Sequence, residues 1–377
     1  MNSSKKNASS RIFRLQDQHD GLTLAAALKE LNPSVAWGQV KKWIQNRQVQ
    51  VNGNLCLDAA RRVKSSDVVK YFANPLSKPI ESSDIRIAYI DEHLVVVEKP
   101  AGVTSVRHVE ERRLSTRRRQ LQPTLEELLP PTLARIQRLR WPPLPPKGMN
   151  RGRRPSNERR GRTGNPPIQN AKKLPPELQV FPVHRLDRET SGLMLFARNR
   201  MAEQRLTAMF KRHTIEREYL AVCLGKVEPQ TISSLLVRDR GDGVRGSLTN
   251  NPDQSGERET QTATTHVLSA EYFSSGEQSY SLVRLKLETG RTHQIRIHLS
   301  ELGHPLCGDK IYQKNKDGEI VLDPSGASRQ ALHSDRIEFT HPVTGQHLVF
   351  GMAMPKDLES WLHRLRSDDA SPGKVSS

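Results

Sequence analysis

The sequence is poor in cysteine, in aromatic residues and in long apolar runs. Its three cysteines, Cys56, Cys223 and Cys307, are odd in number and widely spaced among 377 residues, which argues against a disulfide framework. Aromatic residues make up 5% and apolar residues 35%, so part of the length is predicted to be solvated. No apolar run approaches the roughly eighteen residues of a membrane-spanning helix.

The first sixteen residues contain no acidic residue and no apolar run of the kind that a secretory signal needs. We therefore expect a cytoplasmic protein, with an organellar transit peptide as the alternative. Over the whole chain 59 Lys and Arg stand against 41 Asp and Glu, a formal charge of +18. Such an excess indicates a polyanionic partner, of which nucleic acid is the commonest.

The positive charge is concentrated in one stretch. Between Arg107 and Lys173 there are eighteen basic and five acidic residues, a surplus of +13. Its later part, residues 142–176, is rich in Pro, Gly, Asn and Arg and is predicted to be a mobile loop. Two short helical turns are expected before it, at 124–129 and 132–139, separated by a break or kink at Pro130 and Pro131. The stretch is either a solvated spacer or a tether for RNA phosphates.

Deletion of residues 141–173 distinguishes a tether from a spacer. A tether adds sequence-independent phosphate contacts, so its removal should leave the fold intact but flatten the dependence of RNA affinity on salt concentration. Binding measured over a series of salt concentrations checks this, and an unchanged slope would discard the tether.

Residues 21–71 have the pattern of a small helix and strand unit. Leu24, Leu28 and Leu31 recur at helical spacing, and residues 35–45 repeat this with Trp37, Val40 and Ile44. Polar and apolar residues then alternate over 48–51 into an Asn-Gly turn, and Val63 with 68–69 indicates a further strand. This pattern resembles the S4 RNA-binding domain, most clearly over residues 39–53.

The remainder shows mixed α and β patterns. Strands are predicted at 94–97, 193–197, 219–224 and 280–287, and a helix at 202–210. Thr292 is expected to cap a helix that ends at Gly303, and residues 358–365 form a closing helix. We expect a frayed tail after position 367.

A dense polar run, residues 184–193, precedes the predicted strand at 193–197. In it Asp187 lies between Arg185 and Arg188, which should favour its ionised form. Such a carboxylate can act as a nucleophile or a base, although a structural Arg-Asp-Arg network would have the same sequence.

The run His-Arg-Leu-Asp-Arg-Glu-Thr-Ser-Gly closely resembles the H-R-L-D-x-x-T-S-G motif of the RluA-type pseudouridine synthases. Further stretches fit the same family in order, at residues 98–102, 217–222, 290–298, 303–309 and 339–345. The resemblance implies an α+β fold whose catalytic domain has a mixed, mostly antiparallel sheet. The expected organisation is a disordered tail at 1–18, an S4-like domain at 19–75, a catalytic domain at 84–366 with a basic insertion at about 105–177, and a disordered tail at 367–377.

The resemblance implies that uridine in RNA is isomerised to pseudouridine without a cofactor or a metal. Asp187 corresponds to the essential carboxylate, Tyr219 to an aromatic residue that stacks on the target uracil and whose hydroxyl helps to remove the C5 proton, and Arg296 to the cation that pairs with Asp187. Arg185 corresponds to a residue that enters the RNA stack when the uridine is flipped out. Lys99 and Pro100 are expected at the pocket floor. The proposed RNA-binding residues are Arg185, Lys99, Lys41, Lys42, Arg47, Arg61 and Arg62.

Ribosomal RNA of the large subunit is the expected substrate and a monomer the expected state. The alternatives are a transfer RNA substrate, a non-catalytic RNA-binding protein of ribosome assembly, and an RNA N-glycosidase that would release uracil. His293, His298, His304 and Cys307 suggest zinc, but a five-residue step on a helix turns the first two histidines about 140° apart, and no C-x-x-C pair accompanies them. We therefore expect no metal site.

Overall fold

The computed structural model describes residues 10–52, 54–73, 80–107, 123–143, 174–238, 245–248, 259–313 and 320–367. These residues form two compact units. The first contains the described residues up to position 80 and Pro123, and the second contains those of 81–107 and from 124 onward. In this part of the chain no helix is long and apolar enough to cross a membrane.

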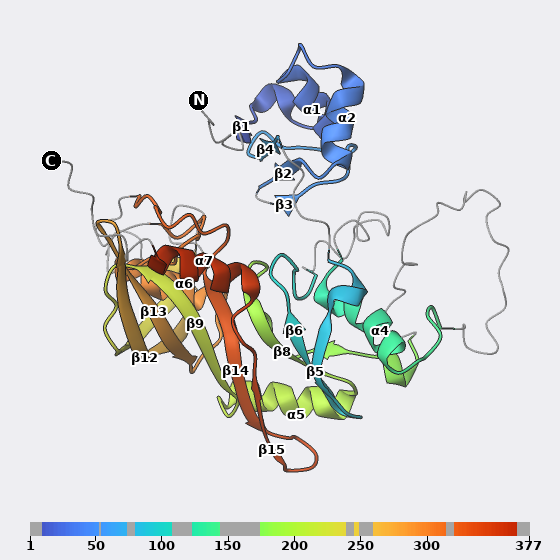
Figure 1. Cartoon of the computed structure of the whole chain (residues 1–377). Coiled ribbons are helices and arrows are strands. Elements are labelled where there is room, and N and C mark those ends of the chain that lie inside the picture. The colour runs from blue at the N-terminus through green and yellow to red at the C-terminus, as the bar shows by residue number, and fades with distance from the viewer. Residues whose placement is uncertain are drawn as a thin grey trace. The chain divides into compact units, whose positions relative to one another are not determined.

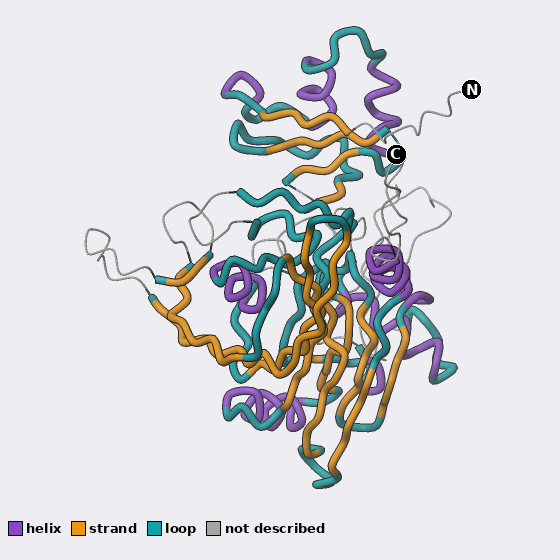
Figure 2. Tube along the Cα trace, turned by 60° about the vertical axis from the view of Figure 1, so that its left-hand side comes forward, coloured by secondary structure: helices purple, strands orange, loops and turns teal. Residues whose placement is uncertain are grey.

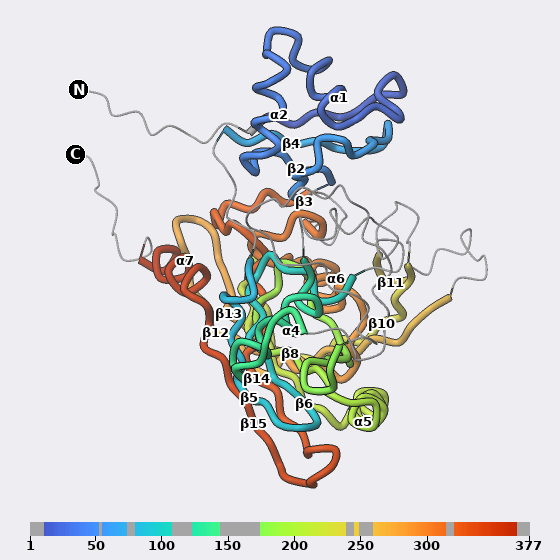
Figure 3. The backbone as a smooth tube through the Cα atoms, turned by 90° about the vertical axis from the view of Figure 1, so that its right-hand side faces the viewer, coloured from blue at the N-terminus to red at the C-terminus, as the bar shows by residue number. Residues whose placement is uncertain are grey.

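The N-terminal unit is a four-stranded antiparallel sheet covered by two helices. The strands lie in the order β1-β4-β2-β3 and are β1 (Ser10–Arg14), β2 (Val49–Val51), β3 (Asn54–Leu55) and β4 (Val68–Phe72). The helices are α1 (Leu24–Glu30) and α2 (Trp37–Gln45), with a 3-10 turn η1 (Asp17–His19) before them. Figure 3 shows both helices on one side of the strands. Leu24, Leu28 and Ile44 are fully buried against Val49 and Val69.

Three sequence predictions for this unit are wrong. The expected tail at 1–18 includes β1, because Phe13 and Leu15 pack into the core and β1 pairs along its whole length with β4. Trp37, counted in the apolar stripe of α2, is 44% exposed, and the tryptophan that packs in the core is Trp43. Val63 is buried but lies outside the strand that begins at Val68.

The second unit is built on one large sheet, which Figure 1 and Figure 2 show from two sides. Its path runs β11-β10-β12-β13-β9-β14-β8-β6-β5, with β15 added to β14 and β7 to β8. The strands are β5 (Arg86–Ile90), β6 (Leu94–Lys99), β7 (Phe181–Pro182), β8 (Ser191–Ala197), β9 (Glu216–Leu224), β10 (Gln230–Val237), β11 (Gly246–Ser247), β12 (Thr260–Ser275), β13 (Gln278–Leu287), β14 (Leu332–Thr340) and β15 (His347–Gly351). Only the β14–β8 pair is parallel among these described strands, so the sheet is mixed and mostly antiparallel, as expected.

Four helices accompany this sheet: α4 (Leu125–Ile136), α5 (Arg200–Lys211), α6 (Gln294–Glu301) and α7 (Lys356–Ser367). Short 3-10 turns, η2 (Ser82–Asp84) and η5 (Pro176–Leu178), contact α4.

Along β9 alternate side chains point to opposite faces. Val222 and Leu224 pack against α7, so Tyr219, at an odd offset from both, points to the other face. Cores beneath α5 and α6 complete the packing.

The segment predicted as a basic insertion is partly folded. The two expected helical turns are one continuous helix, α4, with Pro130 and Pro131 inside it, so the predicted break is wrong. The apolar face of α4 is buried, which compensates for the two backbone hydrogen bonds that the prolines cannot donate. Arg107 is buried and forms a short ion pair with the half-buried Glu127, 2.6 Å between Nη2 and Oε2, and so belongs to the fold rather than to a solvated spacer. Residues 144–173 lie outside the described residues.

Candidate active site

The polar loop between β7 and β8 is held by side chains that bind its backbone carbonyls. Lys99 Nζ donates to the carbonyls of Arg188, at 3.0 Å, and Thr190, at 2.6 Å. Arg329 Nη1 donates to the Glu189 carbonyl at 2.9 Å. Ser105 Oγ donates to the Leu186 carbonyl and accepts from the Leu186 amide. The loop that carries Asp187 is therefore fixed on both sides of that residue.

Lys99 is fully buried, which contradicts its prediction as an RNA-binding residue. Its third hydrogen bond is to its neighbour, the carbonyl of Pro100, at 3.2 Å. An ammonium group has three donors, so this set uses all of them within the protein. Burial lowers the pKa of Lys99 to about 7. Its observed contacts hold the backbone of the loop, and neither Lys99 nor Pro100, both expected at the pocket floor, is among the residues that line the cavity.

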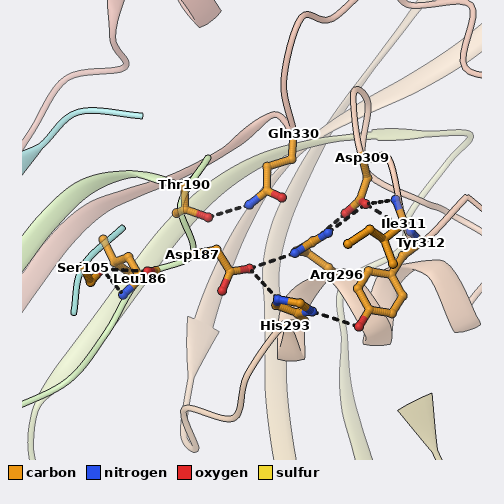
Figure 4. Close-up of polar contacts among 10 residues, drawn as sticks. All are labelled: Ser105, Leu186, Asp187, Thr190, His293, Arg296, Asp309, Ile311, Tyr312 and Gln330. Carbon is orange, nitrogen blue, oxygen red and sulfur yellow. Dashed lines mark hydrogen bonds and ion pairs between the residues drawn. The ribbon is translucent and has the colours of Figure 1, made fainter. Parts of the chain in front are cut away.

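Asp187 and Arg296 meet across the site, as Figure 4 shows. Arg296 Nη1 donates to Asp187 Oδ2 at 3.1 Å, and its Nε and Nη2 donate to both oxygens of Asp309 at 2.6 and 3.0 Å. Burial alone would lower the pKa of Arg296, but the two carboxylates outweigh it and raise that pKa above the usual arginine range. The cation that pairs with Asp187 is therefore Arg296, which lies 109 positions away in the sequence. Arg188, the sequence neighbour of Asp187, instead donates from Nε to the Gly102 carbonyl.

His293 is the second group beside Asp187. Its Nε2 lies 3.8 Å from Asp187 Oδ2, and its Nδ1 is hydrogen-bonded to the hydroxyl of Tyr312 at 2.9 Å. His293, and not the predicted Thr292, is the N-cap residue of α6. Its backbone lies in the left-handed region, with φ 61°. Burial lowers the pKa of His293 below that of an exposed histidine.

These groups line a cavity of about 380 Å³ between α5 and α6. Asp187, His293, Arg296 and Tyr219 contribute to its wall, and its volume is within the range of small-molecule sites, roughly 300–1,000 Å³. Tyr219 is buried, which raises the pKa of its hydroxyl. The cavity therefore combines a paired carboxylate, a histidine and an aromatic ring.

The remaining predicted RNA-binding residues differ in exposure. Arg185 is exposed and lines the cavity. In the N-terminal unit Lys41, Lys42 and Arg62 are exposed, the last with a hydrogen bond from Nη1 to the Gly21 carbonyl, at 2.6 Å. The other two, Arg47 and Arg61, are half-buried.

The histidines that suggested zinc have separate partners. His298 is hydrogen-bonded to Ser234 and Thr265, each at 2.9 Å, and His304 to the Leu224 carbonyl at 3.0 Å. Burial lowers the pKa of His298 to about 4. Among the described residues no group of three histidine, cysteine or acidic side chains is arranged to hold a metal ion.

Comparisons with known proteins agree with the motif. Residues 146–301 match the family model of RNA pseudouridylate synthase, and residues 24–69 match the S4 domain. The uncharacterized RNA pseudouridine synthase YlyB of Bacillus subtilis is 30% identical over 335 residues, which cover 88% of this chain and 89% of that protein. This chain belongs to the RNA pseudouridylate synthase family.

Another member of the family, ribosomal large subunit pseudouridine synthase D of Nitrosomonas europaea, is 28% identical over 376 residues, which cover 97% of this chain and 90% of that protein. A third, the uncharacterized RNA pseudouridine synthase YhcT of Bacillus subtilis, is 38% identical over 184 residues, or 48% of this chain and 55% of that protein. Both resemblances inferred from the motifs, to this family and to the S4 domain, are confirmed.

Sequence reasoning missed three members of the site: His293, Asp309 and Tyr312. His293 was considered only as part of a motif and as a zinc ligand, and Asp309 only as part of a motif. An arginine has five donors and a single carboxylate cannot occupy them all, so a second acceptor for Arg296 was to be expected, but no sequence signal identified Asp309 as that acceptor.

Proposed function

We propose that this pseudouridylate synthase isomerises a uridine of large-subunit ribosomal RNA, with the N-terminal unit binding RNA and the second unit performing the chemistry. The substrate class rests on the relatives named for it and on the excess of positive charge. We propose a cytoplasmic monomer that needs no cofactor.

One observation carries the proposal: the carboxylate of Asp187 is held by Arg296 at the wall of a cavity lined by Tyr219. Asp309 binds the far side of the same guanidinium with two hydrogen bonds, so Arg296 is fixed before any substrate enters. Charged groups preorganised in this way stabilise developing charge without rearranging. The flipped uridine would stack on the ring of Tyr219, and Arg185, exposed at the cavity, would fill the space left in the RNA.

The reaction is a rearrangement in which nothing is consumed. The N1–C1′ bond breaks, the uracil turns while bound, and a C5–C1′ bond forms; C5 then loses its proton and N1 gains one. Cleavage at C1′ develops positive charge on the sugar, which a carboxylate at residue 187 would stabilise, as in glycoside cleavage. The same carboxylate could also attack C1′ or C6, or remove a ribose proton.

Ribosomal RNA labelled with tritium at C5 of uridine tests the proposal with the full chain. A synthase releases tritium to water and leaves pseudouridine in the RNA, because the bond from C5 to hydrogen is replaced by a bond from C5 to C1′ of the sugar. Free uracil would identify a glycosidase, and tight binding without release a non-catalytic RNA-binding protein. A parallel reaction with transfer RNA compares the two substrate classes, and faster release from transfer RNA would overturn the ribosomal assignment.

A further inference from the structure

Arg217 is a buried cation in the wall of the cavity, and it has no role in the function proposed above. It lies on β9 two residues before Tyr219, so the two side chains point to the same face of the sheet, and both line the cavity. Arg217 is 6% exposed. Buried arginines are normally paired with a carboxylate, because an unpaired charge away from water is strongly destabilising.

No carboxylate in the described part of the chain pairs with Arg217. Its two sequence neighbours are acidic, but they point to the opposite face of β9. There Glu216 pairs with Lys286 at 3.0 Å, and Glu218 pairs with Arg284 at 2.9 Å. The strand that carries Arg217 therefore supplies no negative charge to it.

The contacts of Arg217 occupy few of its donors. Among the described residues it makes one hydrogen bond, from Nη2 to the Glu288 carbonyl at 3.4 Å, and its buried Nε makes none. Its Cζ lies 5.3 Å from the centre of the Phe210 ring, a contact that favours a cation without neutralising it. Gly290 leaves space for Nη1, because a Cβ there would lie 2.6 Å from this atom. Since a guanidinium has five N–H donors, several remain for a bound molecule.

The charged groups of the cavity wall are arranged in an order. Tyr219 interacts electrostatically with both Asp187 and Arg217, whereas Tyr219 is the one described ionisable group whose charge acts to raise the pKa of Arg217. His184, beside Arg217, adds no charge, because burial and the charge of Arg217 lower its pKa to about 3. Tyr219 therefore separates the carboxylate from the guanidinium. A uracil stacked on Tyr219, with its sugar against Asp187, would lie between the two charges.

The reaction generates negative charge on the base. When the N1–C1′ bond breaks, its electron pair stays on the uracil, and resonance spreads the charge from N1 to O2, to O4 and to C5, the atom that next attacks C1′. Attack of a carboxylate on C6 would also place negative charge on O4. A guanidinium in a buried site stabilises such charge more strongly than one in water, and it does so most in the transition state, where the charge develops.

From these observations we propose that Arg217 is a catalytic residue that binds a carbonyl oxygen of the target uracil and stabilises the negative charge that the base acquires when it leaves C1′; this assignment rests on the proposed function. The charge is used when C5 forms its bond to C1′. C5 then loses its proton and N1 gains one, so Arg217 is unchanged at the end. Lys211 and Arg291, which are exposed at the same cavity, are better placed for the phosphates of the RNA.

The test is the substitution Arg217→Met in the full chain. Methionine fills much of the same space without a charge. Removal of an unpaired buried cation should leave the urea midpoint of the free protein at or above that of the wild type. Single-turnover formation of pseudouridine should slow about 100-fold or more, while RNA affinity and its salt dependence stay unchanged. Arg217→Lys keeps the positive charge and should recover part of the lost rate.

RNA with 5-fluorouridine at the target position separates charge stabilisation from a structural role. Fluorine withdraws electrons and stabilises the uracil anion by itself. Arg217→Met should therefore slow the disappearance of 5-fluorouridine much less than that of uridine, as measured in digests of the RNA. A structural defect would slow both substrates equally. A phosphate contact would instead weaken RNA binding and make the slope of log Kd against log salt concentration shallower by about 0.7.

Arg336→Met is the matched control for loss of one arginine from the same sheet. Arg336, on β14, is exposed, pairs with Glu338 and does not line the cavity. Its substitution should leave the rate unchanged. The assignment to Arg217 alone is overturned if the wild type forms pseudouridine and Arg217→Met keeps its rate, slows both substrates equally, or weakens RNA binding with a shallower salt slope. A wild type that forms no pseudouridine overturns both proposals.

Discussion

Asp187→Asn should abolish tritium release, with a loss of about 10⁴-fold or more, the scale found when an essential carboxylate leaves a cooperating catalytic group. The amide has nearly the same shape but carries no negative charge to stabilise the sugar as the N1–C1′ bond breaks. Arg296 keeps its two hydrogen bonds to Asp309, so the variant should fold and bind RNA as the wild type does. Single-turnover tritium release and RNA binding, measured on the same preparation, check both parts.

Glu271→Gln is the control for loss of one negative charge. Glu271 is paired with Arg366 at an exposed site away from the cavity, 2.6 Å between Oε1 and Nη2, and the pair should contribute little to stability. This variant should keep the wild-type rate. Tritium release by Asp187→Asn within tenfold of the wild type would contradict the role assigned to Asp187 while leaving its contact with Arg296 unaffected.

Local patterns in the sequence predicted the parts of the fold that depend on neighbouring residues. The apolar run at 193–197 is buried throughout in β8, and the alternation around Val283 and Leu285 is the burial pattern of β13. The helix at 202–210 and the closing helix lie where their apolar spacing placed them. A local pattern suffices in these cases because β8 is buried on both faces, which a continuous apolar run indicates, and each of the other elements buries one face, which periodic apolar spacing indicates.

The sequence predictions were wrong where contacts between residues far apart in the sequence determine the structure. Strand β1 looks like a basic tail because its pairing with β4 spans more than fifty positions and leaves no local pattern. Helix α4 continues through two prolines because its leucines are buried in the second unit. Trp37 and Trp43 could not be ranked by hydrophobicity alone, and Trp43 packs in the core because it meets Tyr71, with ring centres 4.3 Å apart.

The sequence predicted which residues belong to the active site, but it did not predict most of the contacts between them. The motif indicated the pair of Asp187 and Arg296, and these side chains meet in the structure. The flanking arginines suggested a different partner, because sequence proximity cannot say which cation the fold brings to a carboxylate. His293, which faces Asp187, has a left-handed backbone, a conformation that a non-glycine residue adopts in few places and that no local pattern predicted.

Gly192→Ala should give the largest loss of stability of any substitution considered for this chain. Gly192 has φ 127° and stands where β8 runs parallel to β14, and a Cβ there would lie 2.2 Å from the carbonyl oxygen of Ser334. An alanine must both adopt a strained backbone and push the two strands apart. Together these effects should cost roughly 3–5 kcal/mol in the free energy of unfolding, measured by urea denaturation. Activity should fall as well, because Ser191 and the loop of Asp187 move with the strand.

Gly345→Ala separates backbone strain from the steric clash. Gly345 also has a positive φ, 74°, but a Cβ there would meet no heavy atom within 4 Å. Its substitution should cost only about 1–2 kcal/mol, the strain of the left-handed conformation alone, and should leave activity intact. Equal losses for the two variants would mean that the strands yield at Gly192 without cost, and would contradict the steric clash expected between a Cβ there and Ser334.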